Sequence, residues 1–547
     1  MRFRSLLVIL LIFSLPAALP AQTIWYVKHN ATGLNNGTSW TNAFTDLQAA
    51  LNAAQPGEQV WVSAGTYLPT QPADGMSADM RHRSFVLPTG VGVYGGFAGN
   101  EPANFDLGQR DFQNNITILS GDLEQNDDDS SGVTTTPIGI NSFHVVIAAN
   151  ITGAVLDGFT ITGGVANGDN AIDVHGESIA DNLGGGLAIN AAAITLSNIG
   201  LLGNSAYEGG GCRMVGATAT IHNGLIRKNF AVYGGGLTLY ETPAVLIEKT
   251  IIDDNTAEEW GGGYYCAATS AFIHHVIVRH NTARAGGGGL IFSSTTVISN
   301  SLFADNTATA NESAGDHAGG GLGFFGTEAW ITNVTVTNNR ATSSSLAGVW
   351  ALYSSFNLRN SILAGNIGVG LVKDLRVDEH EIWNSIVGND YHNGGAIEVG
   401  FVTGDLFRNP AAGDYSLALN SAAINAGSNN WYAVGGAPDL SAITTDLAGA
   451  NRIMAGFVDL GAYECQLSPD ATGILYVHSS APAGEQGSRK EALRREYYRV
   501  EQATNAGEDA AKPGCQTGAG QPLQAQLHKL QHLPAHRRRP ECGYLRP

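Results

Sequence analysis

The feature that most constrains the fold is a sequence repeat that recurs at intervals of about 25 residues. Each repeat carries an asparagine followed by small or apolar residues, and a run of glycines comes shortly after it. The asparagines of this first column are Asn204, Asn229, Asn255, Asn281, Asn306 and Asn339, and Asn366 continues the series. A repeat of this length holds one supersecondary unit that cannot bury its apolar side alone, so successive units must stack.

A second column of residues lies six positions upstream of the first. Its members are Asn198, Asn223, Lys249, His275, Asn300, Asn333 and Asn360. Short alternating strings such as VIVRHN and SLFADN lie between the columns and are typical of strands of about four to six residues. Three such strands and three turns make up one coil of a parallel β-helix.

Equivalent residues of neighbouring coils should lie on top of one another, about 4.8 Å apart. At that distance the first-column asparagines can form a ladder of amide hydrogen bonds. The glycine runs start at Gly184, Gly209, Gly234, Gly261, Gly287 and Gly319. They predict a sharp corner where the backbone takes a positive φ or approaches another segment closely.

Alternation after each glycine run predicts which side chains point into the coil. The first and third residues after the runs should form two interior stacks, namely Leu187 and Ile189, Cys212 and Met214, Leu237 and Leu239, Tyr264 and Cys266, Leu290 and Phe292, and Leu322 and Phe324. Cys212 and Cys266 would then lie two coils apart, about 10 Å. Because a disulfide does not span that distance, we expect both to be buried free thiols.

The predicted fold class is therefore all-β, a parallel β-helix solenoid with a small N-terminal α/β cap over its open end. In the cap, FTDLQAALNAA predicts one helix and EQVWVSAGTY the first strand. The glycine corner with its downstream asparagine resembles the repeats of polymorphic outer membrane proteins over about residues 140 to 400. The N-terminal segment is similar to the cap of many exported β-helix proteins, and both resemblances imply the right-handed form of the solenoid.

The segment after the repeats, which includes TTDLAGANRIMAGFVDLGAYEC, closely resembles the choice-of-anchor Q module. The residues that match its pattern are Asp446, Gly449, Arg452, Gly456, Asp459, Gly461 and Glu464. Such modules typically follow a β-helix and precede surface-sorting tails. The resemblance implies surface display or secretion, and it implies no chemistry.

The two ends of the chain differ from the repeats. Residues 1–21 place two arginines ahead of a short apolar run that ends in small residues, which is the pattern of a secretory signal peptide. After Cys465, GILYVHSSAPAGEQGS echoes the N-terminal IWYVKHNATGLNNGTS, and from Arg489 the echo stops. We interpret 467–547 as the start of a broken second repeat module with a disordered tail. The regions before it are a cap with the first coils at 22–138, the repeats at 139–400 and the anchor-like module at 401–466.

Charged residues just before the first-column asparagines are candidates for a catalytic site. In a polysaccharide lyase built on this fold, Asp253 and Asp254 would hold Ca²⁺ against a uronate while Arg279 abstracts a proton. The alternative is structural. Arg227, Asp253 and Arg279 occupy one column with alternating sign, and opposite charges on neighbouring strands stabilise each other. We expect a charge ladder rather than a catalytic site.

Aromatic residues before the glycine runs are candidates for glycan binding. Tyr207, Tyr233 and Trp260 recur one coil apart, so their rings could form a strip that suits the flat face of a sugar. Aromatic stacks that merely stiffen a corner are the alternative. No nucleophile elbow, phosphate loop or CxxC motif accompanies them in the sequence.

An acidic loop, GDLEQNDDDSSG, is a candidate Ca²⁺ site. It offers Asp122, Glu124, Asn126 and Asp128 at alternating positions, as loops that bind hard cations do. Asp127 replaces the glycine that such loops carry at the sixth place. A solvated acidic loop without a metal is therefore the default interpretation, and Ca²⁺ is the one cofactor that the sequence suggests.

Two functional hypotheses remain. The first is an exported surface or secreted protein without catalytic activity, acting in adhesion or glycan contact through the lateral face of the solenoid. The alternative is a pectate-lyase-like polysaccharide lyase or hydrolase that uses Ca²⁺. The formal net charge of -19 argues against a nucleic acid partner. We expect an extracellular glycan or cell-surface component as partner, and no transmembrane segment after signal cleavage.

Overall fold

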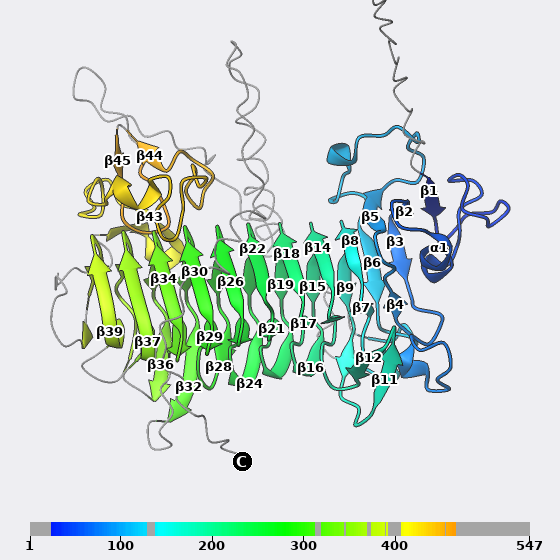
Figure 1. The fold of residues 1–547 in the computed structure, drawn as a ribbon, viewed down its shortest axis with the longest axis horizontal. Helices are drawn as coiled ribbons and strands as arrows, with labels where there is room; N and C mark the ends of the chain where they lie inside the picture. Colours follow the sequence, from blue (N-terminus) through cyan, green and yellow to red (C-terminus); the bar gives the residue numbers. More distant parts are fainter. Residues whose placement is uncertain are drawn as a thin grey trace, which may run out of the picture.

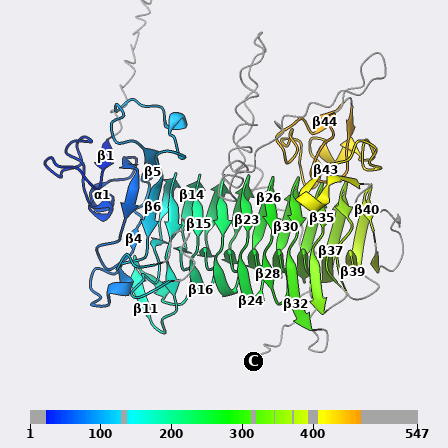
Figure 2. The ribbon, with the colours of Figure 1, turned by 180° about the vertical axis from the view of Figure 1, so that it is seen from behind.

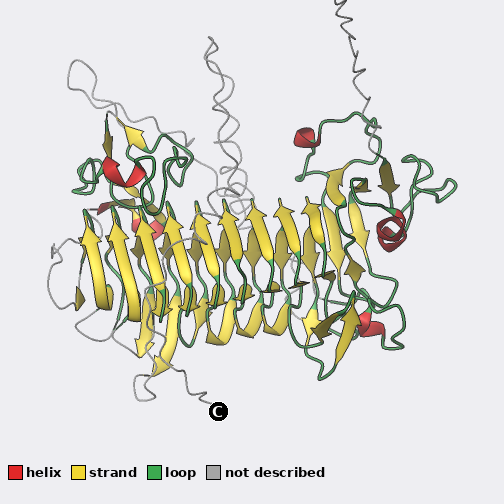
Figure 3. Cartoon of the chain, in the orientation of Figure 1, coloured by secondary structure: helices red, strands yellow, loops and turns green. Residues whose placement is uncertain are grey.

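A computed structural model describes residues 23–466 except 128–136, 312–318, 344–345, 369–372, 389, 392–405 and 455. Its body is a right-handed parallel β-helix, seen from opposite sides in Figures 1 and 2. Strands make up most of its regular structure (Figure 3). The signal peptide and the tail predicted from the sequence lie outside the described residues.

Each complete coil has four short strands, one more than the sequence predicted. The first and second strands of the coils join one large parallel sheet. The first strands are β7 (Val146–Ala149), β13 (Leu187–Asn190), β17 (Cys212–Val215), β21 (Leu237–Tyr240), β25 (Tyr264–Ala267), β29 (Gly289–Phe292), β33 (Leu322–Phe325) and the start of β37 (Val349–Arg359). The second strands are β8 (Thr152–Asp157), β14 (Ala193–Ser197), β18 (Thr218–His222), β22 (Ala244–Glu248), β26 (Ser270–His274), β30 (Thr295–Ser299), β34 (Glu328–Thr332) and the end of β37.

The third and fourth strands form two further parallel sheets. The third strands are β9 (Thr160–Thr162), β15 (Gly200–Leu202), β19 (Leu225–Arg227), β23 (Ile251–Asp253), β27 (Ile277–Arg279), β31 (Leu302–Ala304), β35 (Thr335–Thr337), β38 (Ile362–Leu363) and β40 (Ile386–Val387). The fourth, additional strands are β10 (Val165–Ala166), β16 (Ser205–Glu208), β20 (Phe230–Tyr233), β24 (Thr256–Trp260), β28 (Thr282–Ala283), β32 (Thr307–Asn311) and β36 (Arg340–Ser343). From β16 onward they directly follow the first-column asparagines, whose ladder keeps the next residues extended and in register.

The first-column asparagines form a continuous ladder inside the coils. Asn229 donates its backbone N–H and its side-chain amide to Oδ1 of Asn255, at 3.0 and 2.9 Å. It also donates to the Leu201 carbonyl at 2.8 Å. The same pair of bonds joins each asparagine of the column to the next as far as Asn366. There the ladder ends on Asp374, whose Oδ1 accepts both bonds. A carboxylate suits this end because it accepts hydrogen bonds and donates none.

The interior stacks follow the predicted alternation, with one exception. Leu187 faces Cys212 and then Leu237 in the parallel register. Cys212 and Cys266 are buried free thiols, as predicted. The exception is the predicted pair Leu290 and Phe292, which lies on the outer face instead. Tyr264 pairs with Gly289 and Cys266 with Ile291, so the interior residues of that coil are Gly289 and Ile291.

A close approach explains why a glycine takes this interior position. A Cβ atom at Gly289 would lie 2.5 Å from the ring of Tyr264. The ring therefore fills the space that a side chain would need. The corner in this coil starts at Gly286, which has a positive φ of 66°, and not at Gly287 as the sequence suggested. A four-glycine run allows either register, and the neighbouring tyrosine selects one of them.

The second-column residues all adopt the left-handed backbone conformation. Their φ angles are between 44° for Asn300 and 54° for Asn223, and Lys249 and His275 share this conformation. Asparagine tolerates a positive φ better than most residues do. This conformational requirement explains why asparagine recurs in the column. It makes each second-column residue the corner between a second and a third strand.

The N-terminal cap contains the predicted helix. The helix α1 (Leu47–Ala53) is capped by Asp46, which accepts from Gln48 N at 2.9 Å. The strands around it are β1 (Ile24–Val27), β2 (Gln59–Ser63), β3 (Gly65–Tyr67), β4 (Phe85–Val86), β5 (Gly92–Phe97) and β6 (Thr117–Ser120). The first strand of the chain is β1, which pairs with β2, so the segment predicted to be first is second. A hairpin of β11 (Ala171–Val174) and β12 (Glu177–Ala180) covers the outer face of the early coils.

Residues 406–466 form a small module that lies alongside the later coils (Figures 1 and 2). Its strands are β42 (Phe407–Asn409), β43 (Asp414–Leu417), β44 (Ile453–Met454) and β45 (Phe457–Val458). The solenoid itself continues to β39 (Leu375–Trp383) and β41 (Asp390–Tyr391). Apolar side chains of the module pack on the outer faces of second and third strands, among them Tyr432, Leu440 and Val458 on Phe272 and Val297, and Phe407 and Leu460 on Leu302 and Ile362. The module therefore closes laterally on the β-helix.

Candidate functional site

Arg227, Asp253 and Arg279 form the charge column that the sequence predicted. They occupy equivalent positions of β19, β23 and β27. Nε of Arg227 lies 3.4 Å from Oδ2 of Asp253, and Nε of Arg279 lies 3.5 Å from Oδ1 of the same carboxylate. His280 Nδ1 adds a contact of 2.9 Å to Asp253. Two arginines and a histidine thus surround one carboxylate that is only 2% exposed.

This surrounding sets the charge of Asp253. Burial alone would raise its pKa, but the hydrogen bond from His280 and the attraction of Arg279 and Arg227 more than reverse this, so the pKa lies below its ordinary value. Asp254 adopts the left-handed conformation, with φ of 62°, and its exposed carboxylate lies 3.9 Å from Arg227. Asp253 and Arg279 are therefore held to each other, which suits the joining of coils better than capture of a cation.

The residue before each first-column asparagine forms a further left-handed column that the sequence reasoning missed. Its members are Gly203, Lys228, Asp254, His280, Asp305, Asn338 and Gly365. The signal was present in the sequence, since these positions hold only Gly, Asn, Asp, His or Lys, and the first four of these types are favoured or tolerated at positive φ. Asp305 connects this column to the C-terminal module, because Tyr415 Oη of the module donates to its carboxylate at 2.9 Å.

Tyr207, Tyr233 and Trp260 come together at the corner before the glycine runs. The ring centroids lie 5.5 Å apart for Tyr207 and Tyr233 and 5.2 Å apart for Tyr233 and Trp260, with planes at 77° and 58°. Tyr265 joins them from β25, 6.0 Å from Trp260. We call these four residues the aromatic corner. Its rings meet at steep angles, so they do not form the row of flat faces suggested by the sequence.

Ion pairs flank the aromatic corner. Arg213 Nε lies 2.8 Å from Glu208 Oε2, and Arg284 Nε lies 2.5 Å from Glu259 Oε2. All four side chains are partly exposed. Tyr207 is 44% exposed, so the corner is open to solvent at this residue, while the other three aromatic side chains are partly buried. Aromatic rings beside accessible charged donors and acceptors can pack against the C–H groups of a sugar and hydrogen-bond to its hydroxyls.

The acidic loop turns its carboxylates onto its own backbone. Asp122 Oδ2 accepts from Asp127 N at 3.0 Å, and Glu124 Oε2 accepts from Ile140 N at 3.1 Å. Asn126 donates to Glu124 at 3.4 Å, and Asp128 lies outside the described residues. Within the part of the chain that the structure describes, no group of three or more His, Cys, Asp or Glu side chains is placed to hold a metal ion.

The C-terminal module binds the corner formed by the second column. Asn333 donates to the carbonyls of Asp459 and Gly461, at 2.7 and 3.0 Å. Asn360 exchanges hydrogen bonds with the backbone of Ser428, at 3.0 and 2.8 Å. Asn300 donates to the Thr445 carbonyl at 3.1 Å. The second-column asparagines thus form the corners of the coils and also hydrogen-bond to the backbone of the module. The sequence alone did not indicate this second role.

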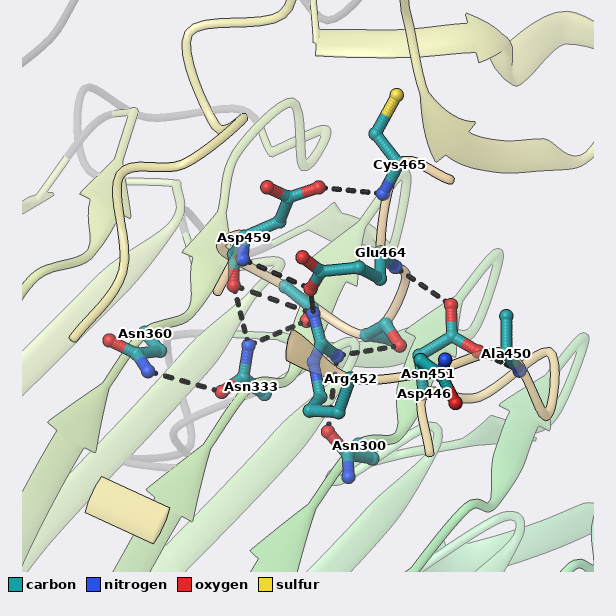
Figure 4. Close-up of polar contacts among 12 residues, drawn as sticks. Asn300, Asn333, Asn360, Asp446, Ala450, Asn451, Arg452, Asp459, Glu464 and Cys465 are labelled. Carbon is teal, nitrogen blue, oxygen red and sulfur yellow. Dashed lines mark hydrogen bonds and ion pairs between the residues drawn. The ribbon is translucent and has the colours of Figure 1, made fainter. Parts of the chain in front are cut away.

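Residues that match the choice-of-anchor Q pattern form the buried polar centre of this module (Figure 4). Arg452 is 1% exposed and lies 2.8 Å from Glu464. It also donates to Asn300 Oδ1 at 3.2 Å, which connects the module to the solenoid. Asp446 and Asp459 accept backbone N–H groups from Glu464 and Cys465. Burial raises the pKa of all three carboxyl groups, to about 7 for Glu464.

Three solved structures illustrate what the fold is similar to. Pectate lyase Pel9A matches with 13% identity and a TM-score of 0.44, over 82% of this chain and 97% of its own. The polygalacturonase from Erwinia carotovora ssp. carotovora matches with 12% identity and a TM-score of 0.27, over 69% and 97%. PfbA, a surface adhesin of Streptococcus pneumoniae, matches with 10% identity and a TM-score of 0.24, over 63% and 85%. No protein-family model and no curated protein sequence matches the chain.

No helix among the described residues is long and apolar enough to cross a membrane.

Proposed function

We propose that this protein is an exported β-helix that binds an extracellular glycan or cell-surface component through the aromatic corner, without chemically changing it. The observation that carries the proposal is the cluster of Tyr207, Tyr233, Trp260 and Tyr265, which is exposed at Tyr207, partly buried elsewhere, and has ion pairs on both sides. Aromatic side chains of this kind supply large contact area with polar tips, which suits binding to sugars.

The pairing of the acidic residues supports a non-catalytic role. A lyase of the kind considered above needs carboxylates that are free to hold Ca²⁺ and a basic group that is free to take a proton. Asp253 instead contacts Arg227, Arg279 and His280. The charges are engaged in joining coils, so they favour a structural interpretation of this column.

Export and surface display are part of the proposal. The signal-peptide pattern at 1–21 and the likeness of residues 401–466 to the choice-of-anchor Q module support both. The likeness of the repeats to polymorphic outer membrane proteins points in the same direction. Mass spectrometry of the mature protein from the culture medium and the cell surface tests this part, with an N-terminus near Gln22 as the expected result.

Glycan binding is tested with a glycan array, followed by titration calorimetry on the best ligand. Trp260→Ala is expected to weaken binding about tenfold, because a well-packed aromatic contact contributes roughly 1 kcal/mol or more. Tyr353→Ala is the matched control, since Tyr353 is an exposed aromatic residue of a later coil, 76% accessible. Equal loss in both variants, or no binding by the unmodified protein, would count against the proposal.

A polysaccharide lyase or hydrolase that uses Ca²⁺ is the second candidate, because Asp253, Asp254, Arg279 and His280 do share one outer face. Incubation with acidic polysaccharides and Ca²⁺, followed by ultraviolet absorbance of unsaturated products and a reducing-sugar assay, separates the two candidates. We expect no turnover. Sustained turnover that is abolished by Arg279→Ala would replace the binding proposal with this one.

A further inference from the structure

A chain of histidines connects the outer face of the β-helix to the C-terminal module. Glu248 of β22 lies between two of them, 2.6 Å from His222 Nδ1 and 2.8 Å from His274 Nε2. His274 Nδ1 lies 2.9 Å from Nδ1 of His275, the second-column residue of that coil. His275 Nε2 lies 2.9 Å from the carbonyl oxygen of Thr445 in the module.

The groups at the two ends of this series of histidines determine which ring nitrogens carry protons. The Thr445 carbonyl only accepts hydrogen bonds, so Nε2 of His275 must donate to it. Burial, with help from His274, lowers the pKa of His275 to about 4, so this ring is neutral near pH 7 and its Nδ1 is an acceptor. Nδ1 of His274 must then donate to Nδ1 of His275. At the other side of its ring, Nε2 of His274 faces the Glu248 carboxylate, which also accepts only.

We infer that His274 carries a proton on both ring nitrogens, and that this single imidazolium charge orients His275 to hold Thr445, so that docking of the module at this corner depends on one proton. Glu248 balances the charge. Burial alone would raise the pKa of Glu248, but its hydrogen bonds to His222 and His274 hold it well below the ordinary value. The carboxylate therefore stays ionised beside His274.

Within the part of the chain that the structure describes, few charged groups act on His275. Those with the largest effect are His274 and, in the preceding coil, Lys249 and Glu248. The module contributes the Thr445 carbonyl and the Thr445 hydroxyl, whose Oγ1 lies 3.3 Å from His275 Nε2. The next coil places Ser299 and Asn300, which are neutral, beside His274 and His275. Loss of the proton from His274 is thus the protonation change that affects this corner.

The consequence of losing this proton is a repulsive contact. The proton on Nε2 stays, because it faces a carboxylate, so Nδ1 loses its proton and two lone pairs face each other across 2.9 Å. His275 can then move its own proton to Nδ1, but its Nε2 lone pair would face the Thr445 carbonyl. The first outcome makes the contact between the two rings repulsive, and the second replaces the hydrogen bond to the Thr445 carbonyl by the longer contact with the Thr445 hydroxyl, at 3.3 Å. Asn300 still donates to that carbonyl, so either outcome weakens rather than abolishes the attachment of the module to the outer face that includes Phe272 and Val297.

Glu248→Gln gives a sharp test on the full-length protein. The glutamine amide can donate to Nε2 of His274, which lets a neutral His274 keep its proton on Nδ1 and hold the chain together at any pH. Hydrogen exchange of peptides covering 440–452 is measured from pH 6 to pH 10 and corrected for intrinsic rates. Relative to Glu248→Gln, opening of wild type should rise by up to about tenfold per pH unit over the range in which His274 is protonated in the docked module and neutral in the open one, because one proton is linked to docking.

Two comparisons keep the test specific. Wild type and Glu248→Gln both contain Glu464, so the titration of Glu464 cancels in the ratio of their exchange rates. His175→Gln, in the distant hairpin loop, should show the same pH dependence of exchange as wild type. Nitrogen-15 spectra of histidine-labelled wild type report the protons directly, with His274 doubly protonated and His275 protonated on Nε2 at pH 6. A His274 that is neutral at pH 6, or identical exchange profiles for wild type and Glu248→Gln, would overturn the inference.

Discussion

Replacing Asn281 by leucine is expected to lower the free energy of unfolding by about 4 kcal/mol, because it leaves buried polar groups of both neighbouring coils without partners. Asn281 is fully buried. Its Oδ1 accepts the backbone N–H and the side-chain amide of Asn255, each at 2.9 Å. Its Nδ2 donates to the Ile252 carbonyl at 2.9 Å and to Asn306 Oδ1 at 3.0 Å. Leucine fills a similar volume and satisfies none of these groups.

The effect is measured by urea unfolding followed by circular dichroism. Thr282→Ala is the matched control, since Thr282 is the next residue and is only partly buried. It should change the free energy of unfolding by less than about 1 kcal/mol, as partly exposed substitutions usually do. If both variants unfold at the same urea concentration, the ladder does not stabilise the solenoid in the way proposed here.

The coil architecture could be predicted from sequence because one repeat determines the neighbours of every residue in it. Asn229 and Asn255 are one repeat apart in the chain and hydrogen-bonded in space. The interior stacks followed from alternation wherever the glycine run had a single possible register. The run that ends at Gly289 had two, and only the ring of Tyr264 in the preceding coil decides between them. That contact depends on packing, which alternation does not encode.

The candidate site was predicted less completely. The column of Arg227, Asp253 and Arg279 followed from the same spacing argument, since its members share one register position. The angles between the rings of Tyr207, Tyr233 and Trp260 did not, because ring orientation depends on side-chain rotamers. The strand register determines which side chains share a face, but it does not determine their rotamers or the angles between their rings.

The spacing of the repeats could not predict where the C-terminal module docks on the coils. Thr445 contacts His275, although the two residues are 170 positions apart in the sequence. The pattern of Asp446, Arg452, Asp459 and Glu464 indicated a module, and the structure adds that these residues form its buried centre. Nothing in the spacing of the second column showed that its later members also bind a separate segment. The module is not part of the repeat, so the repeat spacing carries no information about its contacts with the coils.

Replacing Arg452 by methionine is expected to destabilise the C-terminal module by about 3–5 kcal/mol, the usual effect of removing one partner from a buried ion pair. Arg452 is the cation that faces Glu464, and it also acts on Asp446 and Asp459. Without it, three buried carboxyl groups remain. The expected result is release of the module from the coils, detected as faster hydrogen exchange over 440–466 while the ladder stays protected.

The stability that the module loses in Arg452→Met should be larger at high pH than at low pH. Burial raises the pKa of Glu464 from its ordinary 4.5 to about 7, although Arg452 opposes the shift. A carboxyl group whose pKa is raised by folding stabilises the folded state while it is protonated, and this contribution is lost as pH rises from about 4.5 to about 7. The wild-type module should therefore be more stable at pH 5 than at pH 8, and Arg452→Met should lose more at pH 8.

Glu464→Gln separates charge from shape in this network. Glutamine keeps an oxygen that can accept from Arg452 and from Asp459 N, as Glu464 does at 2.8 and 3.0 Å, but carries no charge. The single variant should remove most of the difference between pH 5 and pH 8. In combination with Arg452→Met it should recover part of the lost stability, because one uncompensated buried carboxylate has been removed. If the double variant is as unstable as Arg452→Met at pH 8, then Arg452 acts through packing and hydrogen bonds rather than by balancing the charge of Glu464.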